Sequence, residues 1–122
     1  MGHQPLILSL DQGTSSSRAA VFNIAGDLIA SASESLKIEY PADGWVQQDP
    51  IDIWESQIGA MRKLKRKLTQ QQYESVVSCG ITNQRETTIL WRRSSGLPCC
   101  AALVWQDGRT SEICLEWKNA GL

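Results

Sequence analysis

The chain has 122 residues, of which 42% are hydrophobic and 20% are charged, and its net charge at neutral pH is −1. This length suits one domain or part of one, and the composition is that of an ordinary globular protein rather than a disordered one. The apolar runs are too short to cross a bilayer, and the charge gives no support for a nucleic-acid partner.

The amino-terminal end and the cysteines indicate a cellular compartment. No positively charged, apolar leader precedes Leu6, so we expect a cytoplasmic protein whose residues 1–4 form a frayed start. The cysteines lack Cys-x-x-Cys spacing and have no histidine nearby, which argues against a zinc site. We expect all four to be reduced and mostly buried: Cys79, Cys99, Cys100 and Cys114.

The first predicted element is a β-hairpin with a polar tip. An apolar run from Leu6 ends at Asp11, a glycine and four hydroxyl residues follow, and apolar residues then resume. Gly13 would let the backbone approach a phosphate, the hydroxyl residues offer donors, and Arg18 adds a positive charge. Asp11 is placed to hold a hydrated metal ion. A serine-rich structural turn, in which Asp11 bonds its own backbone, explains these residues equally well.

Two more strands, at 19–23 and 28–35, would complete an antiparallel three-strand meander. Residues 40–50 are too rich in proline and glycine for a regular element and are expected to form an ordered connector.

A helix is predicted to begin at Pro50, after Asp49 as its N-cap. Its apolar positions recur every three or four residues and predict one buried stripe: Trp54, Ile58, Met61, Leu64 and Leu68. The basic run 62–67 suits the carboxyl end of the helix dipole, which makes a nucleic-acid role the weaker interpretation.

The β-rich run 76–82 follows this helix and is expected to return to the sheet by a crossover. Polar residues at 83–88 then follow a strand end, where open α/β sheets usually bind ligands. The remaining predicted elements are strands at 89–91 and 101–105, a turn at 92–98, and a helix at 110–119 that Gly121 caps.

Four separate stretches resemble, in their order and spacing, the amino-terminal signature segments of the glycerol kinases: residues 11–18, 44–50, 80–88 and 104–107. These enzymes are carbohydrate kinases of the actin and hexokinase superfamily. The resemblance implies an α/β, ribonuclease H-like mixed sheet with an antiparallel meander and a crossover helix. It also implies that residues 1–122 form a partial amino-terminal domain, an incomplete first lobe that covers about a quarter of a family member.

The activity that the resemblance implies is ATP-dependent phosphorylation of glycerol to glycerol 3-phosphate, with ATP and Mg²⁺ as cofactors. Asp11 would hold the metal and act in catalysis together with Arg18. Phosphate would be bound by Gly13, Thr14, Ser15, Ser16 and Arg18, and glycerol by Arg85, Glu86 and Trp105. The segment from Asn83 to Glu86 resembles the glycerol enzymes rather than their sugar-specific relatives.

Two positions depart from the family pattern, since Ser15 replaces a usual threonine and Gly108 stands where an arginine is common. The family's catalytic aspartate, a later tyrosine of the polyol site and the second domain have no counterpart here, so we expect the isolated chain to be inactive.

Other interpretations stay open at this point. The chain could be a non-catalytic truncated product or a binding partner of a full-length subunit. A ribonuclease H-like nuclease with two metals is disfavoured, because only Asp11 and Glu86 are acidic residues at predicted strand ends. Arg85 and Glu86 could also form a plain surface ion pair. Whether copies of the chain form a homo-oligomer is left open.

Overall fold

The computed structural model describes residues 4–122, which form two compact units. Unit 1 comprises residues 4–37 and 51–84, and unit 2 comprises residues 38–50 and 85–122. Of the expected frayed start, residues 1–3 lie outside the described part of the chain. Among the described residues, no helix combines the length and the apolar character that crossing a bilayer requires.

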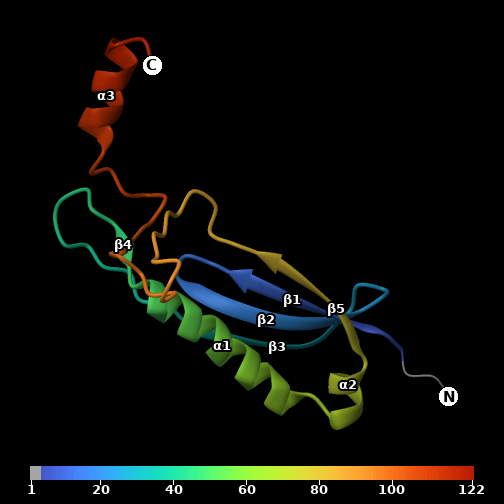
Figure 1. The fold of residues 1–122 in the computed structure, drawn as a ribbon. Coiled ribbons are helices and arrows are strands. Elements are labelled where there is room, and N and C mark those ends of the chain that lie inside the picture. Colours follow the sequence, from blue (N-terminus) through green and yellow to red (C-terminus); the bar gives the residue numbers. More distant parts are fainter. Residues whose placement is uncertain (1–3) are drawn as a thin grey trace. The chain divides into compact units, whose positions relative to one another are not determined.

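Unit 1 is built on a mixed four-stranded sheet with the order β3-β2-β1-β5 (Figure 1). The strands are β1 (Leu6–Gln12), β2 (Ser16–Asn23), β3 (Leu28–Ser35) and β5 (Val76–Thr82). The first three form the predicted antiparallel meander, and β5 lies parallel to β1, as a crossover connection requires. Both β1 and β2 run further into the polar tip than the apolar pattern predicts, because ladder pairing continues to Gln12 and Ser17.

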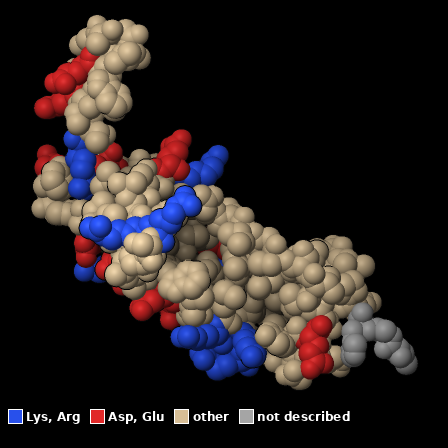
Figure 2. Space-filling model, in the orientation of Figure 1, with Lys and Arg blue, Asp and Glu red and all other residues tan. Residues whose placement is uncertain are grey.

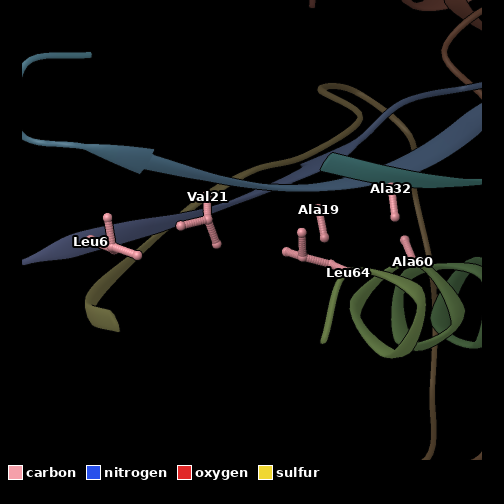
Figure 3. Close-up of a cluster of buried hydrophobic side chains, with 6 residues drawn as sticks. All are labelled: Leu6, Ala19, Val21, Ala32, Ala60 and Leu64. Atoms are coloured by element: carbon pink, nitrogen blue, oxygen red, sulfur yellow. The ribbon is translucent and has the colours of Figure 1, made fainter. Parts of the chain in front are cut away.

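One face of this sheet is covered by α1 (Pro50–Lys67), which begins at the predicted residue. The buried cluster between them combines small and branched side chains, as Figure 3 shows: Leu6, Ala19, Val21, Ala32, Ala60 and Leu64. Alanines on both layers let the helix backbone lie close to the strands.

The helix faces the sheet differently from the predicted stripe. Its buried residues are Ser56, Ala60 and Leu64, which recur every four residues. The prediction that Trp54 is buried is wrong, since its side chain is 66% exposed. Two of these three buried residues, Ser56 and Ala60, are small, which lets the helix lie close to the sheet.

A short helix that we did not predict, α2 (Gln70–Glu74), leads from α1 to β5. It begins with a capping box, in which Thr69 and Gln72 bond each other's backbone N–H groups. The Thr-x-x-Gln spacing was therefore the signal for this helix.

Unit 2 has little regular structure. Its two-stranded sheet pairs β4 (Gln47–Gln48) with β6 (Ala102–Leu103), and its helix is α3 (Ser111–Asn119). The predicted strand at 89–91 is reduced to an isolated bridge between Trp91 and Pro98. Gly121, with φ at +80°, ends the last helix as predicted.

The expectation of buried cysteines is wrong. All four are reduced, but all are exposed. Cys79 lies on β5, an outer strand of its sheet, and Cys114 lies on α3, which has no buried residue in this structure. The other two, Cys99 and Cys100, lie in the irregular segment before β6.

Candidate active site in two parts

The first part of the site is the tip of the β1–β2 hairpin. The N–H of Gly13 donates to the carbonyl oxygen of Ser16 at 2.9 Å, which closes the turn. A Cβ at position 13 would lie 2.7 Å from that same backbone oxygen, so only glycine fits. Of the hydroxyl residues in the turn, Ser15 is exposed, while Thr14 and Ser16 are half-buried. The hairpin prediction is confirmed, and its tip is a tight turn that carries hydroxyl groups.

Buried polar contacts hold the tip in place. Ser17 is fully buried, and its Oγ donates to Gln12 Oε1 at 3.0 Å and lies 2.6 Å from Ser56 Oγ on α1. From the segment that follows β5, the Nε2 of Gln84 donates to the carbonyl oxygen of Gly13 at 2.9 Å. Sequence reasoning assigned no such positioning role to these residues. Their burial reveals this role, and burial is not visible in the sequence.

Asp11 and Arg18 are direct partners in the β1–β2 ladder, and Thr82 is the partner of Asp11 on β5. Side chains of directly opposite residues project from the same face of a sheet. Asp11 and Arg18 are both exposed. The structure therefore brings the predicted carboxylate and guanidinium together at the base of the tip.

Whether the tip suits a magnesium ion depends on its donors. Within residues 4–122, no three His, Cys, Asp or Glu side chains gather closely enough to hold a metal alone. Asp11 offers one exposed carboxylate. Because Mg²⁺ is commonly bound through one or two carboxylates together with water and substrate phosphates, the tip fits an ion that brings phosphate ligands with it.

The second part of the site lies in unit 2, around Glu86. This residue has φ at +66°, and it is the one non-glycine residue with positive φ in the described part of the chain. Such a conformation costs about 1–3 kcal/mol and persists where its surroundings enforce it, often at functional sites. Arg85 and Glu86 are both exposed.

Backbone contacts place Trp105 beside this strained residue. Thr88 and Leu103 exchange two backbone hydrogen bonds, at 2.9 and 3.0 Å. The N–H of Trp105 donates to Thr87 Oγ1 at 3.3 Å, and the Trp105 side chain is 53% exposed. The three residues predicted to bind glycerol thus lie on adjoining segments of one unit.

An ion pair that sequence reasoning missed anchors the loop that follows Trp105. The Nε of Arg109 donates to both carboxylate oxygens of Asp107 at 2.9 Å, and the guanidinium carbon lies 4.0 Å from the centre of the Trp45 ring. Asp107 also accepts from the N–H of Val46 at 2.7 Å. These bonds, above all the one from Arg109, lower the pKa of Asp107 to about 2.

The pair joins two of the four signature segments, 44–50 and 104–107. The N–H of Gly108 donates to the carbonyl oxygen of Gly44 at 2.8 Å, so the turn between Asp107 and Arg109 lies against the connector. Opposite charges on either side of Gly108 were a local signal for the ion pair, but no local pattern indicates its contact with the connector.

Comparison with known proteins finds related sequences. The chain is 47% identical to the glycerol kinase of Ralstonia nicotianae over 116 residues, which cover 95% of this chain and 23% of that protein. It is 46% identical to the glycerol kinase of Thermoanaerobacter pseudethanolicus over 94% of this chain and 23% of that protein. The chain therefore spans about a quarter of the length of these relatives.

Solved structures show the same fold. The glycerol kinase of Plasmodium falciparum, solved with ADP, matches with a TM-score of 0.80 and 33% identity, over 96% of this chain and 23% of its own. A xylulose kinase from Brucella ovis matches with a TM-score of 0.87 over 95% of this chain and 24% of its own, and at 22% identity it supports the fold alone. The predicted fold class is confirmed.

Family membership follows from the sequence. Residues 6–122, nearly the whole chain, match the amino-terminal domain of the FGGY family of carbohydrate kinases. Both parts of the site described above lie within the matched residues. The chain belongs to the FGGY family of carbohydrate kinases.

Proposed function

We propose that the chain carries the amino-terminal part of a kinase that transfers phosphate from ATP to glycerol. The observation that carries this proposal is the strained Glu86, which lies next to Arg85 and on a segment bonded to Trp105. The relatives named glycerol kinase, one of them solved with ADP, support the choice of alcohol and of nucleotide.

Unit 2 would bind the polyol. The carboxylate of Glu86 can accept hydrogen bonds from hydroxyl groups, and the guanidinium of Arg85 can donate to them. The half-exposed ring of Trp105 can cover the carbon backbone of a small alcohol. Strain at Glu86 fits this role, because it fixes the carboxylate in a direction that a relaxed loop would not favour.

Unit 1 would bind phosphate. The tight turn at Gly13 gives phosphate oxygens close access to the backbone, and the hydroxyls of Thr14, Ser15 and Ser16 can donate to those oxygens. Arg18 would offset the charge that builds up during transfer, and Asp11 would hold a magnesium ion that neutralises the phosphate oxygens. The proposal requires Asp11 and Glu86 to serve the same reaction.

We further propose that the 122-residue chain binds glycerol but does not turn it over. The chain spans 23% of the Ralstonia nicotianae relative, and phosphoryl transfer depends on groups that surround both the alcohol and the nucleotide. Steady ATP-dependent formation of glycerol phosphate by the purified chain, abolished in an Asp11→Ala variant, would contradict this part of the proposal.

Glycerol binding is tested by tryptophan fluorescence. Titration of the chain with glycerol is expected to change the emission of Trp105, and the change should disappear in Trp105→Phe. Trp91→Phe is the matched control, since Trp91 is also an exposed tryptophan of unit 2 but lies outside the proposed site. Glu86→Gln should shift the titration to higher glycerol. A flat response of the wild-type chain at molar glycerol would refute polyol binding.

A second candidate is the non-catalytic partner of a longer subunit, and one observation favours it. β5 is an outer strand of its sheet, and its side chains Val77 and Ile81 are 69% and 76% exposed. Edge strands with bare apolar residues commonly pair with another chain. A pure chain that stays monomeric at high concentration while it responds to glycerol would favour the first candidate.

A further inference from the structure

An open pocket of about 830 Å³ on unit 1 connects the hairpin tip with the carboxyl-terminal half of α1. Four basic side chains line it, one from β2 and three from α1: Arg18, Lys63, Arg66 and Lys67. Figure 2 shows basic side chains gathered over this end of α1. The whole chain carries a net charge of −1, so this basic lining is a local concentration of positive charge.

The helix divides its basic run between two faces. Residues three and four apart are neighbours on a helix, so Lys63, Arg66 and Lys67 share the face that lines the pocket. The other two members of the run, Arg62 and Lys65, instead line an apolar pocket on unit 1. The basic run therefore does more than complement the helix dipole, because three of its members converge with Arg18.

Two lysines of this face are held against the edge of the sheet. The Nζ of Lys67 donates to the carbonyl oxygen of Ser31 at 2.7 Å, and the Nζ of Lys63 donates to that of Ser33 at 3.4 Å. Ser33 is the ladder partner of Arg18 on β2, so the strand register brings Arg18 toward the same edge. Backbone contacts therefore position the two lysines, whose ammonium groups do not merely extend into solvent.

The charges in this pocket are not balanced within the described chain. Lys63 pairs with Glu34, but Arg18, Arg66 and Lys67 have no carboxylate partner among residues 4–122. Asp11 is the one acidic residue in the lining. Three unpaired cations thus face one carboxylate. The partial negative charge of the helix end, roughly half an elementary charge, offsets only part of this excess.

We propose that this pocket binds a small ligand with at least two linked phosphate groups, one at Arg18 and one at Arg66 and Lys67. Guanidinium groups donate two parallel hydrogen bonds to phosphate, and lysine ammonium groups add compact charge. No aromatic side chain is among the residues that line the pocket, and the carboxylate of Asp11 is part of that lining. A base-stacking polynucleotide therefore fits less well than an oligophosphate. The phosphate at Arg18 rests on the proposed function, which already assigns Arg18 to phosphate, whereas the phosphate at Arg66 and Lys67 goes beyond it.

The test is calorimetric titration of the complete chain with inorganic tripolyphosphate, at low salt and with a chelator present. We expect saturable binding that weakens as sodium chloride is added, because exposed charges are screened. Arg66→Gln with Lys67→Gln should weaken it by about tenfold, since each exposed ion pair changes a binding constant by up to about fivefold. The matched control is Arg62→Gln with Lys65→Gln, which removes the same charge from the other face and should change binding less than twofold.

Three results would overturn the proposal: no binding by the wild-type chain, equal weakening in both double variants, or orthophosphate binding as tight as tripolyphosphate. ATP titrated alongside separates two ligand sources, because binding of ATP without binding of tripolyphosphate would mean that the base is recognised. Circular dichroism of each variant checks folding, and the single variant Arg66→Gln provides a milder change. Glu86→Gln should leave tripolyphosphate binding intact, which separates this inference from the proposed glycerol site.

Discussion

The buried contact between Ser17 and Ser56 should couple the hairpin tip to α1, and a double-mutant cycle can measure that coupling. The two hydroxyl oxygens lie 2.6 Å apart, and their residues are 0% and 6% exposed. A neutral hydrogen bond contributes about 0.5–1.5 kcal/mol net, and a buried group left unsatisfied costs about 1–3 kcal/mol.

The two single variants should differ. Ser17→Ala removes the donor to Gln12 Oε1, while the hydroxyl of Ser56 keeps the carbonyl oxygen of Ile53 as an acceptor at 2.9 Å, so the variant should lower the free energy of opening of unit 1 by about 1–3 kcal/mol. Ser56→Ala leaves Ser17 bonded to Gln12 and should cost about 0.5–1.5 kcal/mol. The double variant should lose less than the sum, by a coupling of about 0.5–1.5 kcal/mol.

Hydrogen exchange of the amides of Ala19 and Val21, followed by NMR, reports on unit 1 alone because both residues lie in its core. Ser33→Ala is the control, since Ser33 is an exposed serine on β3 whose hydroxyl has no partner in the described chain. Additivity of the two single effects within about 0.3 kcal/mol would refute the coupling. So would a control as destabilising as Ser17→Ala.

Other predictions concern the core, the turn and the missed ion pair. Leu64→Ala, at a residue 3% exposed, should destabilise unit 1 by about 2–5 kcal/mol in the same exchange experiment, and a loss under 1 kcal/mol would contradict its core role. Gly13→Ala should break the turn bond to Ser16 and weaken phosphate binding more than Ser15→Ala, measured by calorimetry. The pKa of Asp107 is lowered from 3.8 to about 2, so its contribution to unit 2 is fully present above about pH 4 and is lost as the pH falls through 2. Near-ultraviolet circular dichroism should follow that loss, and Asp107→Asn should remove the pH dependence.

The sequence predicted best those helices and strands whose apolar residues follow a regular period and pack on one buried face. The strands at 28–35 and 76–82 have the predicted bounds, and α1 begins at Pro50. The predicted stripe of α1 failed at Trp54, because apolar periodicity cannot say which flank of a helix lies against a sheet lined with alanines. In unit 2, most of the order comes from backbone bonds between irregular segments, which have no period to read.

The ligand-binding roles of Asp11, Arg18, Glu86 and Trp105 remain predictions. Asp11 and Glu86 were singled out because polar residues after strand ends suggest ligand binding, and Trp105 was singled out through the resemblance to the glycerol kinases. The role of Asp107 and Arg109 was missed because Asp107 bonds to Val46 in the connector, which is far away in the sequence. No local pattern specifies such a distant partner. The positive φ of Glu86 was equally out of reach, since the residue type disfavours that conformation.

The supporting residues that were not predicted share one arrangement. In two of the four signature segments a buried polar residue fixes the backbone, and an exposed neighbour is left for chemistry: Gln84 is buried beside the exposed Arg85, and Ser17 beside the exposed Arg18. Asp107 does the same two residues after Trp105. A substitution at a buried member should therefore move the exposed neighbour without touching any ligand. Variants of the buried residues should lose affinity for glycerol or phosphate to the extent that they lower the free energy of opening of the unit. Variants of the exposed residues should lose affinity while that free energy stays unchanged.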